Sequence, residues 1–268
     1  MNAHELLKRM KEKTASDLYL KVGLPPSFRI HGEVIRDDTS PLSAENIKSI
    51  VDSLLNDYQK RLFSERPDLD FAYSLGGGLR YRINLFRQQG QIGLVARLIE
   101  DQDLTFDGLD LPSVTREFAE LRRGLVLLTG ATGSGKSTTL AAMINHINKH
   151  FCRHIMTIED PIEFLHVDKK SVVNQREVGF DTASFGDALR HVVRQSPDVI
   201  LIGEMRDNDT MMTAISAAET GHLVLSTLHT SDVSHTMDRI INYFPDHLKQ
   251  QVRQELALSL EGIVCMRL

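Results

Sequence analysis

Short hydrophobic stretches separated by turn signals run through the first hundred residues of the chain. Residues 3–13 repeat apolar side chains at helical spacing, and Ser43 is placed to cap a second helix through Leu54. Alternating or apolar runs predict strands at residues 17–22, 26–34, 70–75, 79–86 and 92–98. The glycines at 76–78 separate two of these strands, so a hairpin is expected there. The pattern predicts a small α+β domain over residues 1–99.

One face of the predicted sheet is polar and carries arginines. Arg80 and Arg82 alternate with apolar residues in one strand, and Arg97 does so in the next. Side chains two residues apart lie on the same face of a strand, so the three arginines can share one polar face. A solvated surface is the simpler interpretation of this face, and a functional role is the alternative.

The pattern changes after residue 113. Residues 100–113 are acidic and interrupted by Gly and Pro, which is typical of a linker between domains. From residue 114 to 268, apolar strands alternate with helices, which predicts an α/β sheet covered by helices. The predicted strands are residues 125–129, 155–158, 172–174, 199–203 and 223–228, and the predicted helices are residues 136–150, 184–194 and 207–220.

The last predicted element is a helix. Leu248, Val252, Leu256, Leu260 and Ile263 continue a helical stripe, and the chain reaches residue 268 without a cap, a glycine or a polar tail. This ending predicts that the second domain is truncated at its C-terminal end.

Composition narrows the class of protein. The 268 residues include 31 Lys and Arg against 36 Asp and Glu, and this net charge of −5 argues against a protein that mainly grips nucleic acid. No apolar run approaches the roughly 20 residues needed to cross a bilayer, and no secretory signal is present. Two cysteines without metal spacing favour reduced thiols. We therefore expect a soluble, intracellular protein with no direct nucleic acid partner.

The strongest chemical signal is GATGSGKS at residues 130–137, a full match to GxxxxGK[ST] between a predicted strand and a helix. Glycines in such a loop let backbone N–H groups surround phosphates, and the helix N-terminus adds favourable dipole charge. Lys136 is expected to reach the β- and γ-phosphates, and the Ser137 hydroxyl to ligate Mg²⁺. The candidate nucleotide-binding residues are Gly130, Ala131, Thr132, Gly133, Ser134, Gly135, Lys136 and Ser137.

Acidic residues follow two of the predicted strands. Glu204 ends a buried strand at the position where P-loop folds hold the Mg²⁺ shell, and an ordinary strand-end acid is the alternative. Glu159, Asp160 and Glu163 follow an earlier strand, and one of them could orient or deprotonate an attacking water. The sequence pattern does not distinguish among the three. Two candidate γ-phosphate sensors, with a structural role as the alternative, bracket a further strand: His222 and His229.

Five blocks, taken in order, resemble the secretion ATPases of type IV pili and type II secretion, specifically the pilus retraction ATPases of the PilT/PilU type. The blocks are GATGSGKST at 130–138, TIEDPIEF at 157–164, VNQREVG at 173–179, DVILIGEMRD at 198–207 and AAETGHLVLSTLHT at 217–230. SDLYLKVGLPPSFRIHGEV and LRYRINLFRQQG in the first hundred residues are also similar to the family. The resemblance covers nearly the whole chain.

The resemblance implies a fold, an activity and an assembly. It implies a RecA-like P-loop ATPase core of the α/β class, preceded by a smaller PAS-like α+β domain, in a homo-hexameric ring that uses ATP and Mg²⁺. The implied function is retraction of the pilus in twitching motility. The implied partners are sister subunits, the inner-membrane pilus platform protein and the pilin machinery. With peripheral membrane association only, the expected location is the cytoplasm, at the inner face of the cytoplasmic membrane.

The same resemblance carries over residue by residue. Thr138 joins the nucleotide loop, Glu163 matches the glutamate assigned to water activation, and Glu204 matches the Walker B acid at the metal site. His222 and His229 match the His-box positions of the family. Arg82 and Arg97 resemble the N-domain arginines that reach the γ-phosphate as the two domains close.

Two departures leave alternatives open. The retraction signature is expected in helices beyond residue 268, so the choice between pilus retraction and pilus extension depends on weaker signs. One such sign is the number of cysteines: this chain has two, whereas extension and type II secretion ATPases commonly hold a four-cysteine zinc site. NDTMMTAISAAET at 208–220 favours the PilU branch. The alternatives are an extension or type II secretion ATPase, a DNA-translocating secretion ATPase, and a non-catalytic nucleotide-gated adaptor.

Overall fold

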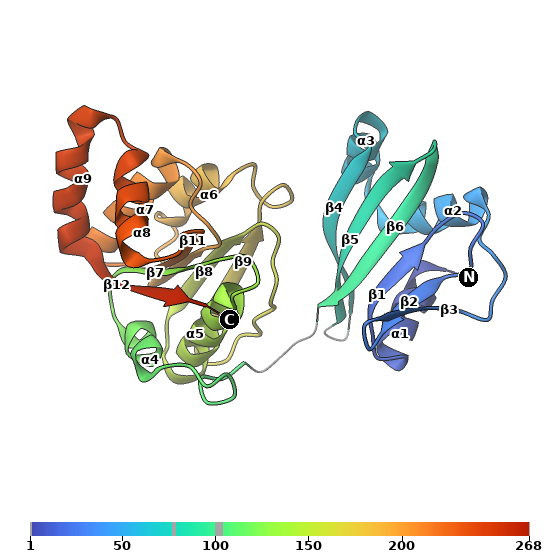
Figure 1. Cartoon of the computed structure of the whole chain (residues 1–268), viewed down its shortest axis with the longest axis horizontal. Helices are drawn as coiled ribbons and strands as arrows, with labels where there is room; N and C mark the ends of the chain where they lie inside the picture. Colours follow the sequence, from blue (N-terminus) through green and yellow to red (C-terminus); the bar gives the residue numbers. More distant parts are fainter. Residues whose placement is uncertain (1, 77–78, 100–103, 268) are drawn as a thin grey trace. The chain divides into compact units, whose positions relative to one another are not determined.

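The structure of the chain, a computed structural model, describes residues 2–76, 79–99 and 104–267. It divides into two compact units, Met1–Asp101 and Gln102–Leu268, each built on its own six-stranded sheet (Figure 1). Of the predicted linker, residues 100–103 lie outside the described residues. The remainder belongs to the second unit, because Leu104 and Phe106 are buried in its core.

The first unit is an antiparallel sheet with helices on one face. Its strands are β1 (Ala15–Leu20), β2 (Ser27–Ile30), β3 (Glu33–Arg36), β4 (Asp68–Gly76), β5 (Leu79–Gln88) and β6 (Gln91–Ile99), in the order β3-β2-β1-β6-β5-β4. The apolar stripes of its helices pack on inward-facing strand residues in one core: α1 (Ala3–Glu12), α2 (Ala44–Leu54) and α3 (Asp57–Glu65). The predicted α+β class and the Ser43 cap of α2 are confirmed.

Three local features of this unit bear on the predictions. The single strand expected over residues 26–34 is wrong, because the chain reverses at His31 and Gly32, whose φ angles are +49° and +87°, to form β2 and β3. The hairpin of β4 and β5 is confirmed, although Gly77 and Gly78 lie outside the described residues. Helix α3 was not among the predicted elements, and its sequence signal is the capping box of Asn56 and Gln59.

The second unit is a parallel sheet in the order β12-β7-β11-β10-β8-β9. Every pairing between its described strands is parallel. All seven residues of the interior strand β7 are buried, as expected for a sheet with helices on both faces. The strands are β7 (Gly124–Gly130), β8 (His154–Glu159), β9 (Val172–Glu177), β10 (Val199–Ile202), β11 (Leu223–Leu228) and β12 (Leu260–Met266).

Helices cover both faces of this sheet. Val126 and Leu128 face a core with α4 (Ser113–Glu120) and α5 (Lys136–His150). Leu125 and Leu127 face the opposite core. The helices of that core are α6 (Phe185–Val192), α7 (Asn208–Glu219), α8 (Val233–Asn242) and α9 (Asp246–Ser259). The predicted α/β class of the second unit is confirmed.

The predicted C-terminal helix is too long. Helix α9 ends at Ser259, and the residues that follow form β12 beside β7. Apolar residues at 260 and 263 fit the helical spacing, but Ile263 and Val264 also suit a strand. Gly262 allows the Phe118 ring of α4 to pack directly on β12, since a side-chain carbon at 262 would lie 2.1 Å from that ring. Pairing with β7, which the local pattern does not contain, decides the outcome.

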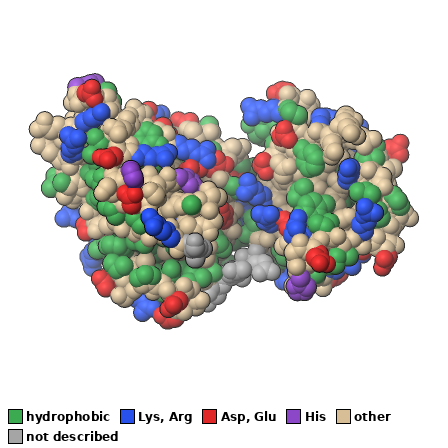
Figure 2. All heavy atoms as spheres, viewed as in Figure 1, with side chains coloured by type: hydrophobic (Ala, Val, Ile, Leu, Met, Phe, Trp, Pro, Cys, Tyr) green, Lys and Arg blue, Asp and Glu red, His purple; other side chains and the backbone are tan. Residues whose placement is uncertain are grey.

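The surface of the chain is mixed in charge. In the view of Figure 2, Lys and Arg side chains (blue) and Asp and Glu side chains (red) are interspersed over both units. Within the described ranges, no helix combines the length and the apolar character that a membrane span requires.

Candidate active site

The loop between β7 and α5 is shaped to surround an anion. β7 ends at Gly130, and α5 begins at Lys136. Gly133 and Gly135 have φ angles of +81° and +87°, which residues with a side chain rarely adopt, so the backbone turns tightly between the strand and the helix. Within this described segment, α5 has no side-chain cap, which leaves its first N–H groups to donate to phosphate oxygens.

The ammonium group of Lys136 is held over this loop. Its Nζ donates to the carbonyl oxygens of Gly130 and Ala131, at 2.9 and 2.8 Å. Burial lowers the pKa of Lys136, and the nearby charges of Glu163 and Glu204 oppose that shift. The cation therefore lies between the loop and the acidic wall that faces it.

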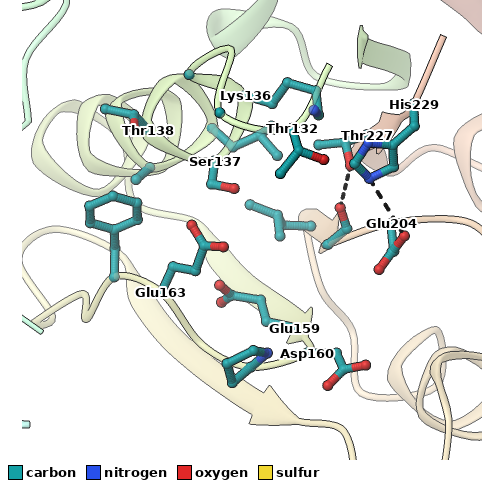
Figure 3. A pocket seen from close by; sticks show the side chains of 18 of the residues that line it. Thr132, Lys136, Ser137, Thr138, Glu159, Asp160, Glu163, Glu204, Thr227 and His229 are labelled. Atoms are coloured by element: carbon teal, nitrogen blue, oxygen red, sulfur yellow. Dashed lines mark hydrogen bonds and ion pairs between the residues drawn. The ribbon is translucent and has the colours of Figure 1, made fainter. Parts of the chain in front are cut away.

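A cavity of about 480 Å³ opens beside the loop. Its walls come from the start of α5 and from the segments that follow β8, β10 and β11. In a parallel sheet the carboxyl ends of the strands lie along one edge, so blocks far apart in the sequence meet there. Figure 3 shows the Glu163 carboxylate pointing toward the Ser137 hydroxyl, with the Glu159 carboxylate beside it.

The residues of the phosphate loop divide between this cavity and a second one. Thr132, Gly133, Gly135, Lys136, Ser137 and Thr138 line the first cavity. A second cavity of about 280 Å³ lies on the other side of the loop, against the end of β12. Thr132 and Gly133 reach both, while three predicted loop residues line only the second: Gly130, Ala131 and Ser134.

Glu204 follows β10 and has two basic side chains beside its carboxylate. His229 Nε2 lies 3.8 Å from Glu204 Oε2, and the Arg206 guanidinium hydrogen-bonds Glu204 Oε1. This hydrogen bond raises the pKa of Arg206 above its usual value. Arg206 also lies 3.9 Å from Asp160. Glu204 therefore presents a carboxylate to the cavity in an ordered position.

Glu159 is the partly buried member of the acidic cluster, whereas Asp160 and Glu163 are exposed. The Thr157 hydroxyl donates to Glu159 Oε1 at 2.6 Å, and the Gln175 amide donates to the same oxygen at 3.2 Å. Burial raises the pKa of Glu159 above its usual value, and the Glu163 charge acts in the same direction. The strand-end position of Glu159 is visible in the sequence, but its burial depends on the neighbouring strand β9.

The structure separates the two candidate histidines. His229 lines the cavity at the carboxyl end of β11. His222 precedes the other end of that strand, where its Nδ1 lies 2.9 Å from the Ala217 carbonyl oxygen. At about 3.3 Å per residue, the two histidines are roughly 20 Å apart. His222 is therefore outside this cavity, and Thr227, which the sequence patterns did not single out, is in its wall.

Arg82 and Arg97 belong to the first unit, where they stand opposite each other on β5 and β6. Like charges in that arrangement repel each other unless each has a counter-ion. Arg97 Nε donates to Asp17 Oδ1 at 2.9 Å, and Arg82 Nε lies 3.9 Å from Asp70. Asp17 is only 3% exposed and also pairs with Arg29 at 3.4 Å. The polar face of this sheet is thus an ordered row of charges.

The second unit and its cavity define a class of protein. A parallel sheet leads through a glycine-rich loop into a helix, and acids at the ends of neighbouring strands face the same cavity. This is the arrangement of a P-loop ATPase.

Comparison with known proteins identifies the family. Residues 80–268 match the family described as "Type II/IV secretion system protein". The chain is 45% identical to the type IV pilus retractation ATPase PilT of Pseudomonas aeruginosa over 268 residues, which are 100% of this chain and 78% of that protein. It is 44% identical to the type IV pilus ATPase PilU of the same organism over 268 residues, which are 100% of this chain and 70% of that protein. A crystal structure of the pilus retraction motor PilT with bound ADP aligns at a TM-score of 0.94 and 43% identity, over 100% of this chain and 78% of that one. The chain belongs to this secretion family.

Proposed function

We propose that this chain is a Mg²⁺-dependent ATPase that works as a homo-hexameric ring and powers retraction of a type IV pilus. The observation that carries the proposal is one cavity lined by the phosphate loop, Glu163 and Glu204. The 45% identity to PilT, which is named a type IV pilus retractation ATPase, supports the pilus as the place of action.

The loop and the start of α5 bind the triphosphate in this proposal. Backbone N–H groups around Gly133 and Gly135 donate to phosphate oxygens, and Lys136 exchanges its carbonyl partners for the β- and γ-phosphates. The Ser137 hydroxyl and the Glu204 carboxylate line one cavity and are hard oxygen donors, so the pair fits Mg²⁺. Mg²⁺, when bound there, supplies charge neutralisation at the phosphates.

Glu163 serves as the base that accepts a proton from the attacking water. Its carboxylate faces Ser137 across the cavity and is exposed, so water can reach it (Figure 3). His229 holds the Glu204 carboxylate beside the γ-phosphate position. We further propose that Arg82 and Arg97 bring positive charge to the γ-phosphate. His222, which lies outside this cavity, keeps the His-box assignment that the resemblance to the family implies. Exposure of the Arg82 and Arg97 side chains, 44% and 67%, supports their availability.

The partners in this proposal are sister subunits, the inner-membrane platform protein and the pilin machinery, at the cytoplasmic face of the membrane. A role in the PilU branch is the second candidate, because the identity to PilU is 44% over the same 268 residues. Restoration of twitching motility in a strain lacking PilT, compared with one lacking PilU, distinguishes the two branches.

The test of the motor is Mg-ATP hydrolysis measured against protein concentration. Turnover per subunit should rise with concentration if the assembly completes the active site, and the Lys136→Ala variant should lose at least about 100-fold of it because the phosphate contact disappears. Sedimentation of the same samples reports whether a hexamer forms as turnover rises. Equal turnover of Mg-ATP by Lys136→Ala and by the natural chain would contradict the assignment of residues 130–138 as the phosphate loop. Full turnover from a monomer would contradict the proposal that the chain works as a hexameric ring.

A further inference from the structure

The block VNQREVG has no role yet in the proposed reaction, although it forms β9 beside the strand that leads to Glu163. β9 pairs with β8 in parallel, and Gln175 stands opposite Thr157. The Gln175 side chain lies behind the cavity wall and does not line the cavity. Any effect of Gln175 on hydrolysis therefore passes through the residues that it contacts.

The Gln175 amide contacts the segment 160–166 on the far side of Glu163. Its Nε2 donates to the Phe164 carbonyl oxygen at 2.8 Å, and its Oε1 accepts from the His166 N–H at 2.9 Å. Its Nε2 also donates to Glu159 Oε1 at 3.2 Å, on the near side of Glu163. One side chain thus joins the residue four positions before Glu163 to the residues one and three positions after it.

The chemistry of these partners sets the orientation of the amide. Two acceptors, the Phe164 carbonyl and Glu159, face the NH₂ group, and one donor, the His166 N–H, faces the oxygen. The reverse orientation would place oxygen against oxygen and nitrogen against N–H. Only a side chain with a donor and an acceptor in this geometry satisfies all three partners.

A second residue of the same strand holds the segment before Glu163. Glu177 is buried, and its Oε2 accepts the Ile162 N–H at 3.2 Å. The contacts of Gln175 and Glu177 therefore fall on both sides of Glu163, whose own side chain remains exposed in the cavity. β9 acts as a fixed support, and the carboxylate projects from a backbone that this support holds.

We propose that Gln175 is a positioning residue that fixes the backbone around Glu163, so that the Glu163 carboxylate meets the attacking water in the correct place. The inference rests on the proposed hydrolysis of ATP with Glu163 as base. A base must lie within hydrogen-bond reach of the proton that it removes, and a displacement of about 1 Å can cost on the order of 100-fold in rate. Nucleotide affinity depends on the loop at 130–138, which Gln175 does not contact.

Three variants test the proposal in the full chain, each assayed for kcat, KM, affinity for a fluorescent ATP analogue and melting temperature. Gln175→Leu removes the donors and the acceptor, so kcat should fall by about 10- to 100-fold while nucleotide affinity stays within about twofold. Asn174→Ala is the matched control on the same strand: the Asn174 amide lies 2.9 Å from the His154 ring, away from Glu163, so this variant should keep natural kcat and KM. Hydrogen exchange at the His166 amide should accelerate in Gln175→Leu because its acceptor is gone.

The Gln175→Glu variant adds a readout that general damage to the fold would not move. Its new carboxyl group faces Glu159 directly, with the Glu163 charge nearby and Glu177 further along the same strand. When ionised, it has no donor for Phe164 and repels Glu159, whereas its protonated form supplies one donor and one acceptor. The kcat of this variant, relative to the natural chain at each pH, should therefore rise by about tenfold from pH 8 to pH 6, whereas that of Gln175→Leu should stay constant.

The outcomes separate this inference from the function on which it rests. Natural turnover in Gln175→Leu, or an equal loss of kcat and nucleotide affinity, overturns the positioning role and leaves the ATPase intact. A relative rate of Gln175→Glu that does not change with pH also overturns it. Absence of turnover in the natural chain, at concentrations where a ring forms, overturns the proposed function and this inference together. If Gln175→Leu does not fold, Gln175→Glu decides by the same pH criterion.

Discussion

The two six-stranded sheets of this chain place their polar residues in different locations. In the antiparallel sheet of the first unit, helices pack on one face, and the other face carries Arg82 and Arg97 with their counter-ions. In the parallel sheet of the second unit, the interior strands β7, β10 and β11 are fully buried, and the candidate catalytic residues of the cavity gather at their carboxyl ends. An open face permits charges along a strand, whereas a doubly covered sheet confines them to its ends.

This difference also separates function from stability. At the edge of the parallel sheet, Glu163 projects from a loop, so its replacement alters chemistry with little loss of packing. On the antiparallel sheet, Asp17 is buried among side chains that are themselves half exposed, so its replacement affects packing and charge together. Four substitutions test the contrast, beginning with the largest expected effect.

The largest effect is expected at the edge of the parallel sheet. Glu163→Gln keeps the size of the side chain and removes its basicity, so kcat should fall by about 100-fold or more, while ATP binding persists. Single-turnover hydrolysis and equilibrium binding of an ATP analogue measure the two quantities separately. Glu219→Gln, an exposed acid at the end of α7, is the control with natural turnover. Loss of ATP binding alone in Glu163→Gln would contradict its role as base.

A smaller effect is expected on the open face of the antiparallel sheet. Asp17→Asn removes the charge that Arg97 and Arg29 share, which should lower the free energy of unfolding by about 1–2 kcal/mol, since both arginines can still reach water. Arg82→Ala breaks only an exposed pair at 3.9 Å and should cost about 0.5 kcal/mol or less. Urea unfolding measures both. In the proposed motor, Arg82→Ala still slows turnover, and equal destabilisation by both variants would erase the contrast between them.

An effect between those of Asp17→Asn and Arg82→Ala is expected at the covered face of the same sheet. The hydroxyl of buried Tyr81 donates to the Leu7 carbonyl at 2.8 Å, so Tyr81→Phe should cost about 1 kcal/mol at pH 7. Burial raises the pKa of Tyr81 to about 12, above the usual value of about 10. The neutral form is favoured in the folded state, so this contribution is complete below about pH 10 and is lost as pH rises through about 12.

Urea unfolding between pH 9 and pH 12 tests the ionisation of Tyr81. The natural chain should lose free energy of unfolding more steeply with pH than Tyr81→Phe, because only the natural chain carries the buried phenol. Parallel slopes for the two proteins would show that the pKa of Tyr81 is the same in the folded and unfolded chain.

Local patterns in the sequence were sufficient for several features. Ser43 followed by an apolar stripe predicts α2, because a cap and a helical repeat are properties of neighbouring residues. GATGSGKS between an apolar strand and a helix predicts the phosphate loop for the same reason. The turn at His31 and Gly32 was missed, although an isolated glycine in a strand pattern signals an irregularity in the strand.

Features that depend on distant partners were not accessible in this way. The residues of β12 fit a helical stripe, and only the vacant edge of β7 and the ring of Phe118 make them a strand. His222 and His229 are equivalent in the sequence pattern, and the direction of β11 alone decides which of them reaches the cavity. The contacts of Gln175 join segments that the sequence separates, so no spacing rule reports them.

By itself, the sequence determined the class of each unit and the chemistry of the phosphate loop, since periodicity, capping and glycine placement act over a few residues. The tertiary structure decided which acids share a cavity, which is buried, and which side chain supports the backbone of Glu163. The physical reason is that burial and strand pairing depend on neighbours in space, and the parallel sheet takes those neighbours from segments many residues apart.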